Sequence, residues 1–156
     1  LIPDLLSKVK NNKKIIIRNP NSTRPWQHVL EPISGYLILA EKLYTKNKTV
    51  CKQIQNWNFG PNISNCKSVK YIASFIAKRT GMKFKIVKIK SKIFKAETNF
   101  LRLNNSKSKQ HLFWYPKWSL DKTLEKILEW NLSIKDKSPR LVCEKQIKQY
   151  LKNQII

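Results

Sequence analysis

The chain has 156 residues, of which 41% are hydrophobic and 10% aromatic, so it carries enough apolar material for one folded domain and is not intrinsically disordered. Its 32 basic and nine acidic residues give a net charge of +23. Such an excess suggests a polyanionic partner or a solvated surface. Only five of the basic residues are arginine, however, and phosphate recognition favours the bidentate guanidinium. Because Lys, Asn and Ile are all abundant and have codons made only of A and T, we attribute much of the charge to coding bias.

Three further exclusions follow from the residue pattern. The longest apolar runs, residues 15–17 and 36–40, are too short to span a bilayer, and no signal peptide pattern begins the sequence. We therefore expect a cytoplasmic protein that does not contact the membrane. The three cysteines are widely spaced and form no C-x-x-C pair, so we expect neither disulfides nor a metal site. Met82 is the sole methionine, and we expect the chain to be the C-terminal part of a longer protein.

The first half of the sequence predicts three helices and three strands. Pro3 fits the first turn of a short helix that ends near Asn11, and the β-branched run 15–17 predicts a buried strand. A loop should then carry Arg24 and His28. Glu31 and Pro32 open a second helix, whose apolar residues form a single face: Ile33, Tyr36, Leu37, Ala40, Leu43 and Tyr44. Residues 56–59 are expected to form a brief strand. A third helix should run from Val69 to Gly81, and alternation then predicts a strand over 82–90.

The second half predicts one more strand and three more helices. Residues 100–103 read as a strand, and Asn104 or Asn105 can cap a brief helix that runs to His111. Ser119 is a candidate N-cap for a longer helix, and a tail helix is expected over 144–151. Short strands that alternate with amphipathic helices define an α/β class. The aromatic side chains beside Pro or Gly turns are better explained by core packing than by stacking on bases: Trp57, Phe59, Trp114, Tyr115 and Trp118.

No complete set of catalytic residues is present, because the sequence lacks a glycine-rich phosphate loop and has only two histidines, far apart. Arg24 is the strongest candidate for binding. An arginine followed by Pro25 and Trp26 beside a buried strand can form a bidentate clamp on a phosphate, although a lone arginine is more often a surface charge. His28 lies in the same segment, which core packing alone explains poorly.

Several motifs resemble the C-terminal half of the CDP-glucose 4,6-dehydratase family, within the extended short-chain dehydrogenases/reductases. The most specific is the string Arg-Pro-Trp-Gln-His-Val-Leu-Glu-Pro over 24–32, since wider relatives share only part of it. The other similar stretches are residues 1–6, 57–61, 101–107, 114–120, 129–130 and 146–150. The resemblance implies that residues 1–156 form one C-terminal sugar-nucleotide-binding region of an α/β enzyme whose N-terminal Rossmann lobe is absent from this chain.

That resemblance also implies a reaction and a set of binding residues. The complete enzyme, a lyase, would use NAD to convert CDP-glucose to CDP-4-keto-6-deoxyglucose for deoxysugar synthesis: hydride leaves C4, water is lost across C5 and C6, and the hydride returns to C6. Arg24 would hold the diphosphate, and His28 would lie near the site. The nucleotide would contact Leu1, Ile2 and Pro3, with Ile15, Ile17 and Arg18 near the base or ribose. The catalytic and NAD-binding motifs lie outside the chain, so no catalytic residue is assigned and the isolated chain is expected to be inactive. The complete enzyme is expected to be a homodimer.

Two alternatives remain open at this point. A basic nucleic-acid-binding domain would use the charge and the aromatics, but the lysines are scattered and no nucleic-acid-binding motif is present. A non-catalytic remnant of the dehydratase would depend on a partner chain for stability.

Overall fold

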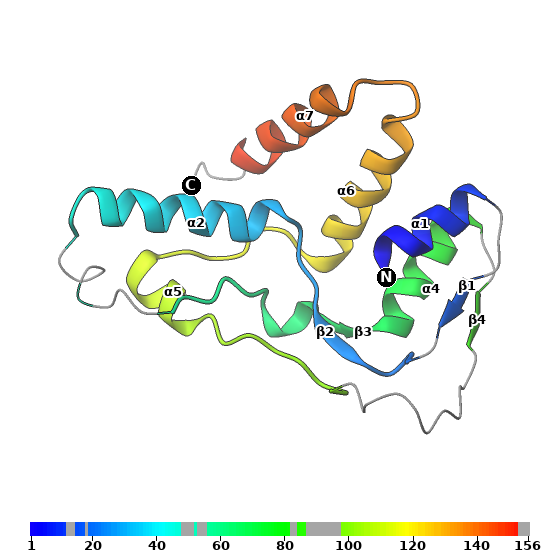
Figure 1. Cartoon of the computed structure of the whole chain (residues 1–156), viewed down its shortest axis with the longest axis horizontal. Helices are drawn as coiled ribbons and strands as arrows, with labels where there is room; N and C mark the ends of the chain where they lie inside the picture. Colours follow the sequence, from blue (N-terminus) through cyan, green and yellow to red (C-terminus); the bar gives the residue numbers. More distant parts are fainter. Residues whose placement is uncertain are drawn as a thin grey trace. The chain divides into compact units, whose positions relative to one another are not determined.

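The computed structural model describes residues 1–11, 15–17, 19–47, 52, 56–81, 84–86 and 98–152. Contacts divide the chain into two compact units. Unit 1 consists of Leu1–Arg24 and Cys66–Leu101, and unit 2 of Pro25–Asn65 and Arg102–Ile156. Figure 1 shows the elements of both units, coloured along the sequence. No helix among the described residues is both long and apolar enough to cross a membrane.

Unit 1 combines helices with short strands. Helix α1 (Ile2–Lys10) starts with proline in its first turn, and β1 (Ile15–Ile17) pairs in parallel with β4 (Phe84–Ile86), with Ile15 opposite Phe84. Helix α4 (Val69–Thr80) begins where the Ser68 hydroxyl accepts a hydrogen bond from the Tyr71 N–H. It ends at Gly81, whose φ of 71° is a left-handed conformation suited to glycine. These elements confirm the predictions for them, as far as residues 82–90 are described.

A second small sheet changes the predicted surroundings of Arg24. Strand β2 (Thr23–Pro25) pairs with β3 (Cys66–Ser68), which follows the 3₁₀ turn η1 (Ile63–Asn65). Thr23 also bridges Phe100 in parallel. The predicted loop is therefore wrong at Arg24, which lies in a strand. The predicted strand over 100–103 is also wrong beyond this bridge, because pairing ends with the bond from the Leu101 N–H to the Thr23 carbonyl.

Unit 2 contains helices α2 (Leu30–Tyr44), α5 (Ser106–Leu112), α6 (Leu120–Ser133) and α7 (Pro139–Lys152). The predicted cap of α6 is confirmed, because the Ser119 hydroxyl accepts from the Lys122 N–H. At α5 the Asn104 side chain accepts from the Ser106 N–H. Helix α7 begins earlier than predicted, since proline at position 139 suits a first helical turn. The mixture of short strands and helices confirms the α/β class.

The predicted strand over 56–59 is wrong, for a reason visible in its hydrogen bonds. Its carbonyl oxygens accept from side chains instead of from a neighbouring strand. Lys107 donates to Asn56, Ser108 to Asn58 and Gln27 to Phe59. The adjacent Gly60 carbonyl accepts from the Asn105 side chain at 2.7 Å. Side chains of α5, of the loop before α5 and of the loop before α2 thus satisfy the carbonyl groups of this segment.

Aromatic side chains form much of the core of unit 2. Phe59, Leu112 and Trp114 form a buried cluster with Ile38 and Leu39 of α2 packed against it. A Cβ atom at Gly35 would overlap the Phe59 ring, so glycine at this position lets the ring reach the helix backbone. Core packing is confirmed for Phe59, Trp114 and Trp118, whereas Tyr115 is exposed.

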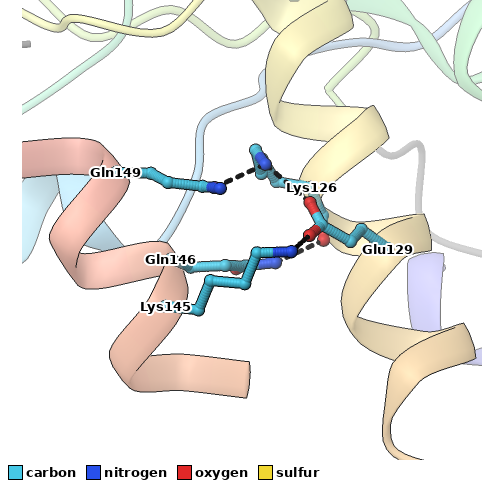
Figure 2. A network of polar contacts seen from close by, with 5 residues as sticks. All are labelled: Lys126, Glu129, Lys145, Gln146 and Gln149. Carbon is cyan, nitrogen blue, oxygen red and sulfur yellow. Dashed lines mark hydrogen bonds and ion pairs between the residues drawn. The ribbon is translucent and has the colours of Figure 1, made fainter. Parts of the chain in front are cut away.

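A polar network joins α6 to α7 (Figure 2). Lys126 is buried, which is unusual for a lysine. Its ammonium donates to both Glu129 and Gln149 at 2.6 Å, and the Lys145 ammonium donates to Glu129 at 2.8 Å. Gln146 donates to the Lys126 carbonyl at 2.8 Å. Hydrogen bonds from the two ammonium groups lower the pKa of Glu129, despite the opposing effect of its partial burial. The network therefore stabilises the packing of α6 against α7 most when Glu129 is ionised.

We predict that Glu129→Gln lowers the free energy of unfolding by about 1 kcal/mol at neutral pH, a modest value because the carboxylate is partly exposed. A lowered pKa in the folded state contributes stability above the pKa of the unfolded chain. The difference in free energy of unfolding between the unchanged chain and Glu129→Gln should therefore be largest above about pH 5. It should shrink as the pH falls through the lowered pKa of Glu129. Urea unfolding at several pH values measures this, with Glu41→Gln on α2 as a control. An equal loss at pH 3 and pH 7 would contradict it.

Candidate functional site

Arg24 lies on a firmly held strand in unit 1. Its Nη1 donates to the carbonyl oxygens of Thr23 at 3.0 Å and Thr98 at 2.8 Å. The backbone around it is fixed as well, because the Thr23 N–H donates to Asn99 and the Val69 N–H donates to the Ser22 carbonyl. Carbonyl acceptors orient a guanidinium without adding a negative charge. The Arg24 side chain is half-buried. Its direction is set by its strand and by the bond to the Thr98 carbonyl.

The other predicted nucleotide contacts of unit 1 fall at two places. Leu1, Ile2 and Pro3 lie at the start of α1, where Leu1 is 40% exposed. Ile15 and Ile17 lie in β1, and the Ile17 side chain is buried in the core of the unit. Arg18 lies outside the described residues. That these residues contact a nucleotide stays a prediction.

His28 belongs to unit 2, and its surroundings are those of a buried structural histidine. Its Nδ1 accepts from the Leu30 N–H at 3.3 Å, and its ring packs edge-on against Trp118 at 4.8 Å between centroids. Burial lowers the pKa of His28, and the charge on Lys126 lowers it further, while a hydrogen bond with Gln146 acts in the opposite direction. The imidazole is therefore held neutral at the start of α2. Its predicted place near the substrate stays a prediction.

An apolar groove of about 420 Å³ opens beside His28. It is lined by the start of α2 and by residues of α6 and α7, namely His28, Val29, Leu30, Ile127, Trp130, Cys143, Gln146 and Ile147. Most of the surface that lines it is apolar. The groove could accept an apolar group but offers few partners to a charged nucleotide.

Glu31 organises the centre of unit 2, and the sequence reading did not single it out for this role. Only 1% of the residue is exposed. Its carboxylate accepts from the backbone N–H groups of Lys117, at 3.0 and 3.1 Å, and of Trp118, at 2.8 Å. The Tyr150 hydroxyl donates to it at 2.7 Å. One side chain from α2 thus holds the 117–118 segment and α7, which are distant in sequence.

Neighbouring polar groups extend this Glu31 cluster. The Ser34 hydroxyl accepts from the Trp114 indole at 2.9 Å and lies 3.1 Å from the Tyr150 hydroxyl. Burial and the contact with Glu31 raise the pKa of Tyr150, although the Ser34 bond opposes the change. The Lys117 ammonium lies 4.6 Å from the centre of the Tyr150 ring. Burial lowers the pKa of Lys117, against the attraction of Glu31. The Lys117 ammonium is buried and makes no hydrogen bond within the part of the chain that the structure describes. The carboxylate, the two hydroxyl groups and the Trp114 indole are all bonded to other parts of the fold, so the arrangement is structural.

The chain's own residues do not fit a dinucleotide cofactor. Dinucleotide binding needs a loop with several closely spaced glycines at the start of a helix, and the three glycines here are isolated. Gly35 admits the Phe59 ring, Gly60 packs closely against Leu103 and Gly81 ends α4. The described residues also contain no cluster of three His, Cys, Asp or Glu side chains that could hold a metal ion.

Comparison with solved structures defines the class of the fold. The chain aligns with dTDP-glucose 4,6-dehydratase from Bacillus anthracis, solved in complex with NAD, with a TM-score of 0.64 and 20% identity. The alignment covers 83% of this chain and 38% of that protein. The chain therefore has the fold of one part of a sugar-nucleotide 4,6-dehydratase.

Comparison with curated proteins shows which kind of 4,6-dehydratase the chain resembles in sequence. The chain is 38% identical, over 152 residues, to CDP-glucose 4,6-dehydratase of Salmonella typhimurium. That match includes 97% of this chain but spans only 41% of the length of the relative. No protein-family model matches the chain. The resemblance stated from the motifs is confirmed, and the chain is homologous to part of a sugar-nucleotide dehydratase.

We predict that Glu31→Gln lowers the free energy of unfolding by about 2–4 kcal/mol, because the amide offers one acceptor and turns an N–H group toward other donors. Tyr150→Phe should cost less, about 1.5–3 kcal/mol, since it removes the bonds to Glu31 and Ser34 but leaves the carboxylate with its two backbone donors. Denaturant unfolding of the unchanged chain, Glu31→Gln and Tyr150→Phe tests whether the free energies of unfolding fall in this order. A Glu31→Gln protein as stable as the unchanged chain would contradict the role given to the carboxylate.

Proposed function

We propose that this chain is the substrate-binding portion of a CDP-glucose 4,6-dehydratase. The observation that carries the proposal is the 38% identity to the Salmonella enzyme across nearly the whole chain, against 20% to the dTDP-glucose enzyme. The complete enzyme would remove water from CDP-D-glucose and yield CDP-4-keto-6-deoxy-D-glucose in the cytoplasm, for deoxysugar synthesis. It would use NAD held by residues outside this chain and would act as a homodimer.

Arg24 is the residue through which the chain would bind its substrate. A planar guanidinium presents two parallel N–H groups in a fixed fork that matches two phosphate oxygens, whereas a lysine offers one rotatable ammonium. Support comes from its position, since strand pairing and two carbonyl bonds hold the group in one direction before any ligand arrives. Such preorganisation reduces the entropy lost on binding. Leu1, Ile2, Pro3, Ile15, Ile17 and Arg18 would contribute the nucleoside contacts.

The test uses a chimera in which this chain replaces the matching part of the Salmonella relative. Arg24→Ala should weaken CDP-glucose binding by about 1.5–3 kcal/mol, which is roughly 10- to 150-fold in Kd, because charge-assisted hydrogen bonds to the diphosphate are lost. Arg140→Ala on the exposed surface of α7 is the matched control and should leave the Kd unchanged. Isothermal titration calorimetry gives both values.

Two results would contradict the proposal. If Arg24→Ala binds CDP-glucose as tightly as the unchanged chimera, Arg24 does not hold the diphosphate. If the chimera binds dTDP-glucose and CDP-glucose equally well, the assignment of CDP-glucose as substrate is wrong. The 156-residue chain, assayed alone, should form no keto sugar, since its residues supply no dinucleotide site.

A further inference from the structure

Unit 1 has an uneven share of the charged residues. Its sequence contains half of the 32 basic residues of the chain but only two of the nine acidic ones, Asp4 and Glu97. Between residues 42 and 120, Glu97 is the sole acidic residue. Coding bias explains why lysine is abundant, but it does not explain why acidic residues are missing from so long a stretch. The charges on helix α4, which lies in this stretch, show what the unit presents to solvent.

Helix α4 has one packed side and one exposed side. The packed side contributes to the core of unit 1 and consists of Ile72, Ala73, Ile76 and Ala77. Helix α1 also packs against α4 in this unit (Figure 1). The opposite side, with Lys67 just before the helix, is what we call the α4 basic face: Lys67, Lys70, Tyr71, Phe75, Lys78 and Arg79. Their spacing of three and four residues places them on one side of the helix, and all four cations are exposed.

Two aromatic rings hold two of these cations against the helix. The Lys67 ammonium lies 5.8 Å from the centre of the Tyr71 ring, and the Arg79 guanidinium lies 5.4 Å from the centre of the Phe75 ring. Both distances are within the range of a cation–π contact. Because the rings are covered by the protein's own cations, the face offers positive charge to a ligand and not a platform for stacking bases.

The charged residues of α6 and α7 are arranged differently. Glu129 on α6 pairs with Lys126 and Lys145, and Glu144 on α7 pairs with Arg140. Charges of both signs in alternation are the usual pattern for a solvated surface. Helix α4, by contrast, contains no acidic residue from Val69 to Thr80. All three helices come from the same lysine-rich sequence, so coding bias alone does not produce a helix face of one sign.

We propose that the α4 basic face binds the phosphate backbone of a nucleic acid duplex without reading its sequence. The lysines are scattered along the sequence, yet folding gathers four cations of residues 67–79 on one side of a helix. Lys70 and Arg79 lie about 14 Å apart along the helix axis. A duplex carries one negative charge for roughly every 1.7 Å of its own axis, so a row of cations meets a row of anions. Lysine is sufficient for this binding, because it depends on charge and counterion release and not on bidentate recognition.

An anionic membrane fits the α4 basic face less well. A helix that lies on a membrane buries an apolar side between the lipid headgroups. The apolar side of α4 is already buried in the core of unit 1. The aromatic rings on its exposed side lie beneath cations. The face can therefore contact phosphates but has no apolar side to insert, which favours a nucleic acid.

The test compares two pairs of exposed lysines in the full 156-residue chain. Lys70→Gln with Lys78→Gln removes two charges from the α4 basic face. Lys148→Gln with Lys152→Gln removes the same number from α7, so the two variants have the same net charge. Binding of a fluorescent DNA duplex of about 20 base pairs is followed by anisotropy from about 50 to 200 mM salt. Circular dichroism checks that each variant is folded.

For the unchanged chain we expect the logarithm of the association constant to fall linearly with the logarithm of the salt concentration. Loss of two phosphate contacts at Lys70 and Lys78 should reduce this slope by about 1.8 and weaken binding more than tenfold at about 100 mM salt. The α7 variant should keep nearly the full slope. Lys70→Arg with Lys78→Arg should keep it as well, since the charge is retained. If the double Gln variant does not fold, each single substitution should reduce the slope by about 0.9.

Four results would overturn the proposal. Equal losses in the α4 and α7 variants would mean that only the total charge attracts DNA. Absence of duplex binding at about 50 mM salt, or tighter binding of a single strand of the same length, would exclude a duplex as the ligand. Tighter binding to vesicles that contain anionic phospholipid, lost in the α4 variant, would assign the face to a membrane. Displacement of the duplex by CDP-glucose would place the DNA at the sugar-nucleotide site, whereas the proposal requires that CDP-glucose has no effect and does not depend on the proposed function.

Discussion

The burial of one carboxylate, that of Glu31, is the constraint on which unit 2 depends. Removing a charge from water is costly unless donors replace the water, and here two backbone N–H groups and the Tyr150 hydroxyl do so. These donors come from two places in the sequence, both distant from Glu31. The carboxylate is therefore satisfied only when α2, the 117–118 segment and α7 are assembled together.

The same constraint decides which side of α2 faces outward. Glu31 and Ser34 must point toward Tyr150 and Trp114, so the side with Leu37 and Tyr44 is left exposed. The binding proposed for Arg24 has a different basis, because Arg24 and both of its carbonyl acceptors, Thr23 and Thr98, belong to unit 1.

Local signals in the sequence predicted the helices well and the strands less well. The cap at Ser119, the left-handed Gly81 and the proline in α1 act within a few residues, so they can be read directly. The prediction of a strand over 56–59 failed because the carbonyl groups of this segment accept from side chains that are distant in sequence, namely Gln27, Lys107 and Ser108. The Arg24 motif located a candidate binding residue but not its strand. Glu31 was predicted only to open a helix, together with Pro32, and nothing local marks its burial.

Ionisation of the Tyr150 hydroxyl tests the Glu31 cluster most directly. Because burial and Glu31 raise its pKa, the neutral phenol stabilises the fold, and this contribution is lost as the pH rises through the raised value. Ultraviolet difference titration of the chain against Tyr150→Phe isolates this one group. The account predicts that the Tyr150 signal appears only when alkaline unfolding begins, as followed by circular dichroism. Ionisation of Tyr150 at the pH of an ordinary phenol, with the fold intact, would contradict it.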